Sequence, residues 1–161
     1  MVGQKIDGIE VSDAVKKILK SAVEKLNSEG VTPCLATVLV GDDPASTTYV
    51  KNKHNACGKI GIKTKDHKLP SDTTQKELDR IIDSLNNDKE VHGILVQLPL
   101  PKQLNEFTTI SRIFPIKDVD GLTPQNVGLL SMGKSILKPC TPSGIMEMFY
   151  YYKINLEGKN V

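Results

Sequence analysis

Two mainly apolar runs, at 33–40 and 91–98, constrain the fold of this chain more than any other feature. Each has the length of a strand and stops at a residue that breaks regular structure, Gly41 after the first run and Pro99 after the second. Neither run shows the strict apolar–polar alternation of a strand with one wet face. Strands that are buried on both faces are typical of a parallel sheet covered by helices on both sides. The two runs therefore predict the centre of such a sheet.

Helical patterns surround these runs. Asp43 before Pro44 indicates an N-cap and a helix-opening proline, and Gly61 is placed to end that helix. An earlier helix is predicted to begin with Ser12 as its N-cap and to end at Gly30. Its apolar stripe comprises Val15, Ile18, Leu19, Ala22 and Leu26. The remaining predicted elements are a polar edge strand at 62–69, helices at 71–87 and 106–113, and a last helix opened by Thr141 as N-cap and Pro142.

The alternation of helix and strand predicts an α/β fold with three αβα layers and a mainly parallel sheet. Ligands of such sheets bind at the carboxyl ends of the strands. Gln97, at the end of its strand, and the helix start that follows Gly41 should share that edge. The stretch 114–140 shows little regular pattern, and loops of that length are usually functional. It carries the run Asp118-Val119-Asp120-Gly121.

Composition argues against several classes of partner. Lys and Arg number 21 and Asp and Glu 19, so the formal net charge of +2 gives no case for a nucleic-acid or membrane surface. Cys34, Cys57 and Cys140 lie far apart and the three histidines show no ligand spacing, so we expect neither disulfides nor a metal site. The N-terminus lacks the pattern of a signal or transit peptide, and no apolar run reaches membrane-spanning length. These features predict a cytoplasmic protein.

Tyr49 and Lys53 form the most informative pair of polar side chains. On the helix that follows Pro44 they lie one turn apart on the same face. An aromatic ring beside an ammonium group could hold a flat ligand and act on it, but on spacing alone a solvated helix face is the commoner explanation. His54 points about 100° around the helix and is expected to be solvated. Cys57, one turn past Lys53, is expected to pack rather than react.

Residues 128–135 match the phosphate-loop pattern G-x-x-x-x-G-K-[ST] letter for letter. That pattern binds phosphate only between a buried strand and the N-terminus of a helix. No hydrophobic strand precedes it here, and Pro139 follows too closely for a proper helix. We therefore do not expect a nucleotide site at this position.

Four short motifs occur in an informative order. They are Ala45-Ser46-x-x-Tyr49-Val50-x-x-Lys53, Val96-Gln97-Leu98-Pro99-Leu100-Pro101, Lys117-Asp118-Val119-Asp120-Gly121-Leu122 and Pro139-Cys140-Thr141-Pro142-Ser143-Gly144. Together they resemble the bifunctional methylenetetrahydrofolate dehydrogenase/methenyltetrahydrofolate cyclohydrolase family. Each motif alone is moderately specific, and four in order at similar spacing make a strong match. The resemblance runs from Lys5 to Val161 and covers the N-terminal, folate-binding half of the family's architecture.

The resemblance implies roles for individual residues, although each also has a plain structural explanation, such as a turn at Asp120. Tyr49 is similar to the tyrosine that stacks on the folate, and Lys53 to the lysine that reaches the one-carbon bridge. Gln97 matches a glutamine beside that lysine, Asp120 the aspartate that grips the pterin, and Ser46 would brace Lys53. The implied catalytic residues are Lys53, Tyr49, Gln97 and Asp120. The implied substrate-binding residues are Ser46, Tyr49, Val50, Lys51, Asn52, Lys53, Val96, Gln97, Leu98 and Asp120.

In the resembling family the substrate is a tetrahydrofolate derivative, and NADP binds to a second, Rossmann-type domain. The implied activities are oxidation of 5,10-methylenetetrahydrofolate and hydrolysis of 5,10-methenyltetrahydrofolate to 10-formyltetrahydrofolate. We expect a folate-binding catalytic domain at 1–156 and the start of an NADP-binding domain at 157–161. The chain should carry no NADP site of its own, lack dehydrogenase activity and hydrolyse its substrate weakly or not at all.

Some alternatives stay open at this point. A non-catalytic folate-binding or assembly module would keep Tyr49 and Asp120 and do no chemistry. Lys53 could transfer protons or stabilise developing negative charge. The resemblance implies a homodimer formed largely through the second domain, so this chain alone is expected to be a monomer. Both a piece of a longer protein and a natural half-protein fit the sequence.

Overall fold

The computed structural model describes residues 3 and 5–160 of the 161-residue chain. Val161, the last residue of the domain start expected at 157–161, lies outside the described residues, as do Met1, Val2 and Gln4 of the N-terminal segment. In chain order the described elements are α1 (Gly8–Ser28), β1 (Cys34–Val40), α2 (Pro44–Ile60), β2 (Lys63–Leu69), α3 (Gln75–Asn87), β3 (Gly93–Val96), α4 (Glu106–Ser111), α5 (Pro124–Ser131) and α6 (Cys140–Tyr151).

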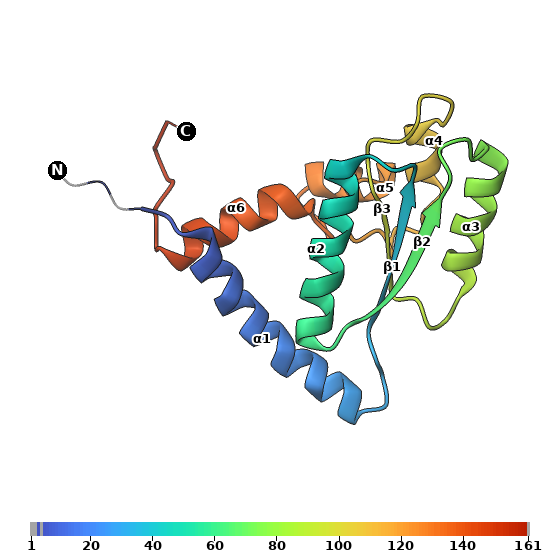
Figure 1. Ribbon diagram of the computed structural model, residues 1–161. Coiled ribbons are helices and arrows are strands. Elements are labelled where there is room, and N and C mark those ends of the chain that lie inside the picture. The colour runs from blue at the N-terminus through green and yellow to red at the C-terminus, as the bar shows by residue number, and fades with distance from the viewer. Residues whose placement is uncertain (1–2, 4, 161) are drawn as a thin grey trace.

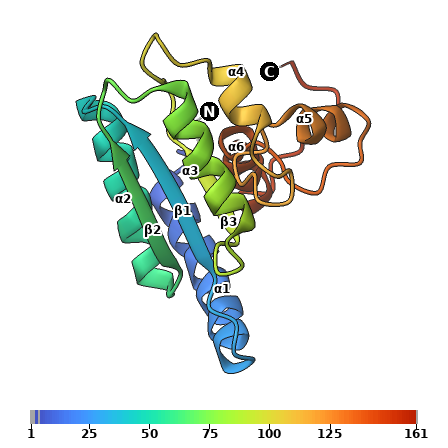
Figure 2. The same cartoon turned by 90° about the vertical axis from the view of Figure 1, so that its right-hand side faces the viewer.

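These elements form three layers, as Figures 1 and 2 show. The three strands make a parallel sheet in the order β2-β1-β3. Helix α2, with α1 outside it, lies on one face of the sheet, and α3 and α4 lie on the other. The predicted α/β fold with αβα layers and a parallel sheet is therefore confirmed. The polar strand β2 lies at an edge of the sheet, as predicted, and none of its residues is fully buried.

The main core lies between the sheet and α3. Val38 and Ile94 on the strands and Leu78 and Ile82 on α3 are completely buried. Burying an aliphatic side chain of this size stabilises a fold by about 1.5–3 kcal/mol. The packing makes β1 and β3 a rigid base, so the residues that follow each strand are held in fixed positions.

The predicted boundaries of α2 are confirmed. The Asp43 carboxylate accepts a hydrogen bond from the backbone N–H of Ser46 at 2.7 Å, and Pro44 is the first helical residue. Gly61 ends the helix with a φ of 85°, a left-handed conformation that favours glycine. Gly30 follows α1 with the same φ of 85°. Asp43, Pro44 and Gly61 thus define the two ends of α2, and Gly30 follows the end of α1.

The expected N-cap of α1 was wrong. Asp7 and not Ser12 is the N-cap, because the Asp7 carboxylate accepts from the backbone N–H of Ile9 at 2.9 Å. The apolar stripe is partly open to solvent, since Ile18 is 71% exposed. Helix α1 packs against α2 and α6 instead of the strands, and only Val11 and Val23 are buried on it.

Two other helix starts differ from the prediction. Helix α3 begins at Gln75 rather than at 71, because Thr74 and Glu77 form a capping box that places the N-cap at Thr74. Helix α6 begins at Cys140, and its N-cap position, Pro139, makes no side-chain capping bond. Thr141 is consequently a residue of the helix and not its cap.

The stretch 114–140 is more regular than predicted, because it contains α5. Thr123 is the N-cap of this helix and Pro124 its first residue, the same signal that opens α2. Residues 128–131 of the phosphate-loop match form the second half of α5, and Gly133 in the following turn has a φ of 68°. The motif thus lies at the end of a helix, whereas phosphate binding requires it at a helix start.

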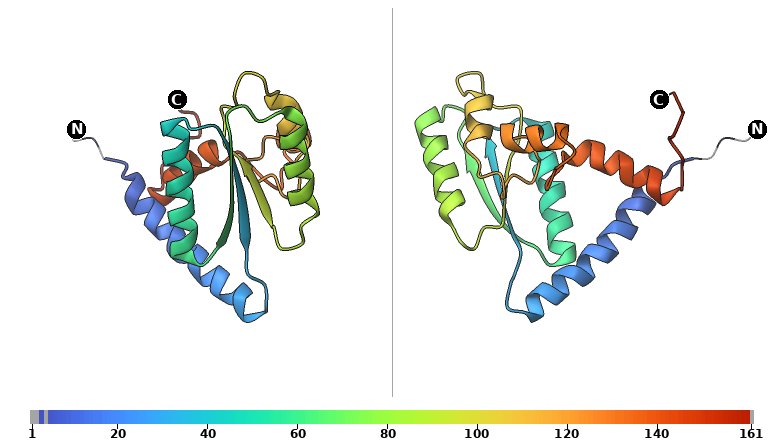
Figure 3. Two further views of the ribbon diagram at one scale, coloured as in Figure 1. Left: turned by 45° about the vertical axis from the view of Figure 1, so that its right-hand side comes forward. Right: turned by 180° about the vertical axis from the view of Figure 1, so that it is seen from behind.

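Helices α1 and α6 converge away from the sheet, as Figure 3 shows. The hydroxyls of Tyr151 and Tyr152 donate to the two carboxylate oxygens of Glu10 at 2.9 and 2.8 Å. The backbone N–H of Asp7 donates to the Tyr152 hydroxyl at 3.1 Å. Helix α6 therefore returns to the start of α1. Within the described part of the chain, no helix is both long and apolar enough to cross a membrane.

Candidate functional site

The centre of the candidate site is a contact between Lys53 on α2 and Gln97 after β3. The Lys53 ammonium donates to the Gln97 amide oxygen at 3.2 Å. Val96 points into the core and is 3% exposed, so strand alternation directs the next residue, Gln97, to the α2 side. The Gln97 backbone N–H donates to the Val38 carbonyl at 2.9 Å, and its side-chain amide donates to the Leu98 carbonyl at 2.7 Å. The amide oxygen of Gln97 is therefore held toward Lys53.

Tyr49 lies one turn before Lys53 on α2, as the spacing predicts, and is 61% exposed. A half-open ring in this position can take a flat ligand on one face. Ser46, a further turn back, is buried, and its backbone N–H and hydroxyl both hydrogen-bond the Asp43 carboxylate. These bonds lower the pKa of Asp43. The structure therefore shows Ser46 bound to the helix cap, whereas its predicted brace on Lys53 stays a prediction.

Asp120 and Cys140 complete the cluster. Burial raises the pKa of the Cys140 thiol, the neighbouring Asp120 carboxylate raises it further, and the Lys53 ammonium lowers it. The thiol also donates to the Val119 carbonyl at 3.2 Å. Asp120 and Lys53 thus both act on the Cys140 thiol. A raised thiol pKa leaves Cys140 protonated at neutral pH and makes it a poor nucleophile.

Gly121 explains how Asp120 reaches this position. Its φ is 64°, and a Cβ atom there would lie 2.8 Å from the Lys138 carbonyl carbon and 2.9 Å from the Pro139 nitrogen. Any other side chain would push the loop away from the backbone that leads into α6. The glycine therefore permits the close approach that brings Asp120 beside Cys140.

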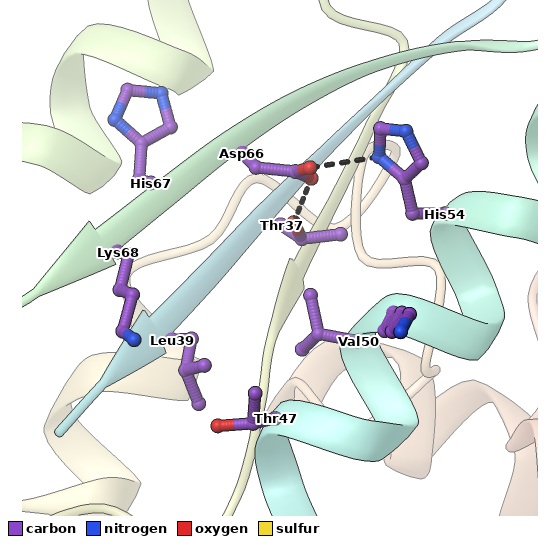
Figure 4. A pocket seen from close by; sticks show the side chains of 9 residues that line it. Thr37, Leu39, Thr47, Val50, His54, Asp66, His67 and Lys68 are labelled. Atoms are coloured by element: carbon purple, nitrogen blue, oxygen red, sulfur yellow. Dashed lines mark hydrogen bonds and ion pairs between the residues drawn. The ribbon is translucent and has the colours of Figure 1, made fainter. Parts of the chain in front are cut away.

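The predicted substrate-binding residues do not all lie together. Val50 and Lys51 line a separate hollow of about 300 Å³ between α2 and β2, shown in Figure 4. Asn52 is exposed on α2, and Val96 is buried in the core, so only its backbone can meet a ligand. Leu98 is partly buried against the same core. The structure thus joins Lys53 to Gln97, with Tyr49 one turn away on α2, and it places Asp120 beside Cys140. Val50 and Lys51 line the separate hollow.

Residues 6–120 match the family model for the tetrahydrofolate dehydrogenase/cyclohydrolase, catalytic domain. The chain belongs to this family. The match spans the motifs that carry Tyr49, Lys53 and Gln97, and it ends at Asp120. The resemblance inferred from the four motifs is therefore confirmed.

Several members of the tetrahydrofolate dehydrogenase/cyclohydrolase family are closely similar to this chain. The bifunctional protein FolD of Nitrosopumilus maritimus is 66% identical over 161 residues, which are all of this chain and 56% of that protein. The crystal structure of the bifunctional FolD enzyme from Campylobacter jejuni is 47% identical with a TM-score of 0.93, covering 96% of this chain and 55% of that one. The Trypanosoma brucei FolD structure, complexed with NADP cofactor and inhibitor, is 36% identical with a TM-score of 0.91, covering 95% and 53%. The chain spans about half the length of the relatives it matches.

A hydrogen-bond network between α2 and the sheet was not predicted from the sequence. His54 is exposed, as expected, but its Nδ1 also lies 2.8 Å from an Asp66 carboxylate oxygen and 2.7 Å from the Thr64 hydroxyl. The hydroxyl of Thr37 donates to the other Asp66 oxygen, and Figure 4 shows Thr37, Asp66 and His54 in the hollow. The network ties α2 to β1 and β2. The sequence feature that could have predicted this network is Thr37, because a buried hydroxyl in an otherwise apolar strand needs a hydrogen-bond partner.

The other thiols and possible ligands play no evident part in the site. Burial raises the pKa of Cys57, which is partly buried, in agreement with a packing role. Cys34 is also partly buried, and burial raises its pKa too. Among the residues that the structure describes, no three metal-ligating side chains lie together.

Proposed function

We propose that this chain forms the folate-binding catalytic domain of an enzyme of one-carbon metabolism. The activities we assign to the whole protein are NADP-dependent oxidation of 5,10-methylenetetrahydrofolate and hydrolysis of 5,10-methenyltetrahydrofolate to 10-formyltetrahydrofolate. The observation that carries the proposal is the hydrogen bond from Lys53 to Gln97 one helical turn from the exposed ring of Tyr49, with Asp120 held beside Cys140. The names of the relatives, which cover both activities, support it.

Each of these side chains has a distinct task in the proposed site. The pterin of tetrahydrofolate presents N–H donors along one edge, which the Asp120 carboxylate accepts with charge assistance. The ring of Tyr49 stacks on the flat part of the folate. Lys53 then lies near the one-carbon bridge, and Gln97, anchored on its own backbone, holds the ammonium in that direction.

The hydrolysis needs groups that manage charge and protons around one carbon atom. The methenyl bridge is a cationic electrophile, and water attack on it gives a tetrahedral carbon whose collapse requires proton transfers. Lys53 is the titratable side chain that we assign to this step. Gln97 is neutral, so it orients Lys53 without fixing its charge. For the oxidation, the domain's contribution is to position the folate.

The turn between β1 and α2 does not fit NADP. A dinucleotide phosphate requires a glycine-rich turn between a strand and a helix N-terminus. The turn between β1 and α2 contains a single glycine, Gly41, followed by Asp42 and Asp43, whose carboxylates repel phosphate. We therefore assign residues 1–156 to the folate domain, residues 157–161 to the lead into an NADP domain, and no step of the hydride transfer to this chain.

Binding and hydrolysis test the proposal separately. The probe for binding is 5-formyltetrahydrofolate, titrated calorimetrically into the chain and into its Tyr49→Ala variant. The probe for hydrolysis is the loss of methenyltetrahydrofolate absorbance, compared between the chain and Lys53→Ala. We expect binding that Tyr49→Ala weakens, weak hydrolysis that Lys53→Ala removes, and no NADP-dependent oxidation.

The opposite results would contradict parts of the proposal. Unchanged affinity in Tyr49→Ala would contradict the site assignment. A chain that binds folate but hydrolyses no faster than Lys53→Ala would be a non-catalytic binding or assembly module. We further propose that the protein is cytoplasmic, and that this chain alone is a monomer in solution with folate as its partner.

A further inference from the structure

Asp118 is a buried carboxylate that the proposed chemistry does not use. It lies two residues before Asp120, is 1% exposed, and forms an isolated parallel bridge with Ile94 of β3. One of its carboxylate oxygens accepts two hydrogen bonds, from the backbone N–H of Thr123 at 2.8 Å and from the side-chain amide of Asn126 at 2.9 Å. A single oxygen of Asp118 thus joins the start of the Asp120 loop to the first turn of α5.

The chain on the N-terminal side of Asp118 is fixed by other contacts. The Lys117 ammonium donates to the carbonyls of Leu85 and Asp88 at the end of α3, at 3.0 and 2.7 Å. The Lys117 carbonyl accepts from the Ile94 backbone N–H at 2.7 Å. These bonds place residue 117 firmly against β3 and α3 but leave the direction of the following turn undetermined.

Asn126 secures the far side of the same turn. It is 3% exposed, and its side-chain amide donates to the Pro115 carbonyl at 2.9 Å as well as to Asp118. Residues 119–122, which carry Asp120, therefore span a loop whose two ends meet at the Asp118 carboxylate. Inside that loop the Gly121 backbone N–H returns to the Asp118 carbonyl at 3.2 Å.

We infer that Asp118 is a positioning residue for the folate site: with Asn126, its carboxylate sets the direction in which Asp120 presents its own. The inference rests on the proposed function, because Asp120 is taken as the group that binds the pterin. A displacement of about 1 Å in a binding group is enough to lose much of its interaction. Without the Asp118 oxygen, both donors lose their acceptor and the turn loses the bond that closes it.

Two substitutions of Asp118 separate the effect of its hydrogen bonds from the effect of its charge. Both donors converge on one oxygen, so the single amide oxygen of Asp118→Asn can accept both bonds, whereas Asp118→Ala offers no acceptor. With 5-formyltetrahydrofolate as the probe, we expect Asp118→Ala to weaken binding about tenfold and Asp118→Asn to restore most of it. Asn126→Ala, which removes one of the donors, should fall between the two. Titrations are made at a temperature at which circular dichroism shows every variant fully folded.

A double-mutant cycle distinguishes positioning from general loss of stability. If Asp118 acts through Asp120, then Asp118→Ala should cost little additional affinity in an Asp120→Asn background. An equal loss of affinity in both backgrounds would overturn the inference, and so would an Asp118→Asn variant as weak as Asp118→Ala.

The same titrations separate this inference from the proposed function. If the chain does not bind the probe, or if Asp120→Asn binds as well as the chain itself, the proposed folate site is wrong and the role of Asp118 falls with it. If the chain binds and Asp120→Asn does not, but Asp118→Ala binds normally, only the role of Asp118 is refuted.

Discussion

The Lys53 ammonium and the Gln97 amide oxygen lie 3.2 Å apart, although 44 residues separate them in the chain. The contact joins α2, on one face of the sheet, to the residue that follows β3. Because the Gln97 amide is also anchored on the Leu98 carbonyl, Lys53 has a fixed acceptor rather than a solvent shell alone. The pair is the geometric reason to treat Lys53 as a reacting group.

The Lys53→Met variant should lose hydrolysis while keeping folate affinity. Methionine retains most of the length of the side chain but carries no ammonium, so any hydrolysis of methenyltetrahydrofolate above the buffer rate should disappear. Affinity for 5-formyltetrahydrofolate should change by less than about threefold, since the ammonium acts on the reacting carbon more than on the pterin. Absorbance decay and calorimetry measure the two effects. Lys59→Met, on an exposed position of the last turn of α2, is the matched control and should behave as the unaltered chain.

The Tyr49→Ala variant should lose affinity without losing stability. Stacking of a flat ring on an aromatic side chain is worth about 1–3 kcal/mol, which corresponds to a loss of about 5- to 150-fold in affinity. Tyr49 is 61% exposed, so its removal should leave the urea midpoint unchanged. Tyr49→Phe should bind normally, and Tyr150→Ala, another exposed tyrosine, serves as the control. A large drop in stability for Tyr49→Ala would show that the ring packs instead of binding.

The Thr37→Val variant should destabilise the fold by about 1–2 kcal/mol, because a buried hydroxyl that donates to a carboxylate is replaced by a group of the same shape that cannot. Thr37 is 1% exposed and donates to Asp66, which also bonds His54. The free energy of unfolding in urea measures the change. Thr108→Val, at an exposed position of α4, should have no comparable effect. Equal stability of the two variants would mean that the network does not hold α2.

Acid should weaken the link between α3 and the end of α4. The Arg112 guanidinium donates to both Asp83 oxygens at 2.7 Å and holds the pKa of Asp83 below its ordinary value of 3.8. A depressed carboxylate pKa stabilises the fold above the ordinary value, and this contribution is lost as the pH falls through the lower, folded-state value. The drop in the urea midpoint across that window should therefore shrink in Asp83→Asn. It should remain in the exposed Asp42→Asn control.

The sequence predicted those elements whose signals are local. Asp43, Pro44 and Gly61 define α2 through capping chemistry that acts within one turn, and the structure has the helix in that place. The apolar runs predicted β1 and β3 because burial on both faces leaves no room for polar alternation. The relative position of Lys53 and Gln97 followed from the rule that ligands bind at strand ends.

Signals that depend on competing partners were misjudged. Ser12 could cap a helix, but Asp7 lies earlier and binds the first backbone N–H groups, so the helix begins sooner. The stripe containing Ile18 is apolar, yet periodicity does not specify which surface a helix packs against. Val50 and Lys51 share a motif with Lys53 and line the hollow beside His54, and their contact with a substrate stays a prediction. Cys140 was seen only as part of a motif, because its approach to Asp120 depends on Gly121, a contact across the fold.

Gly121 packs closely against Lys138 and Pro139, so the position of the Asp120 turn depends on an intact chain before α6. Met132 and Ile136, on the connection between α5 and α6, are 67% and 74% exposed and offer a protease an open stretch of chain. A single cut there would leave the sheet and α3 unbroken but would free the segment against which the Asp120 turn rests. Limited proteolysis of this connection should therefore remove the stabilisation of the domain by bound folate before it unfolds the domain itself.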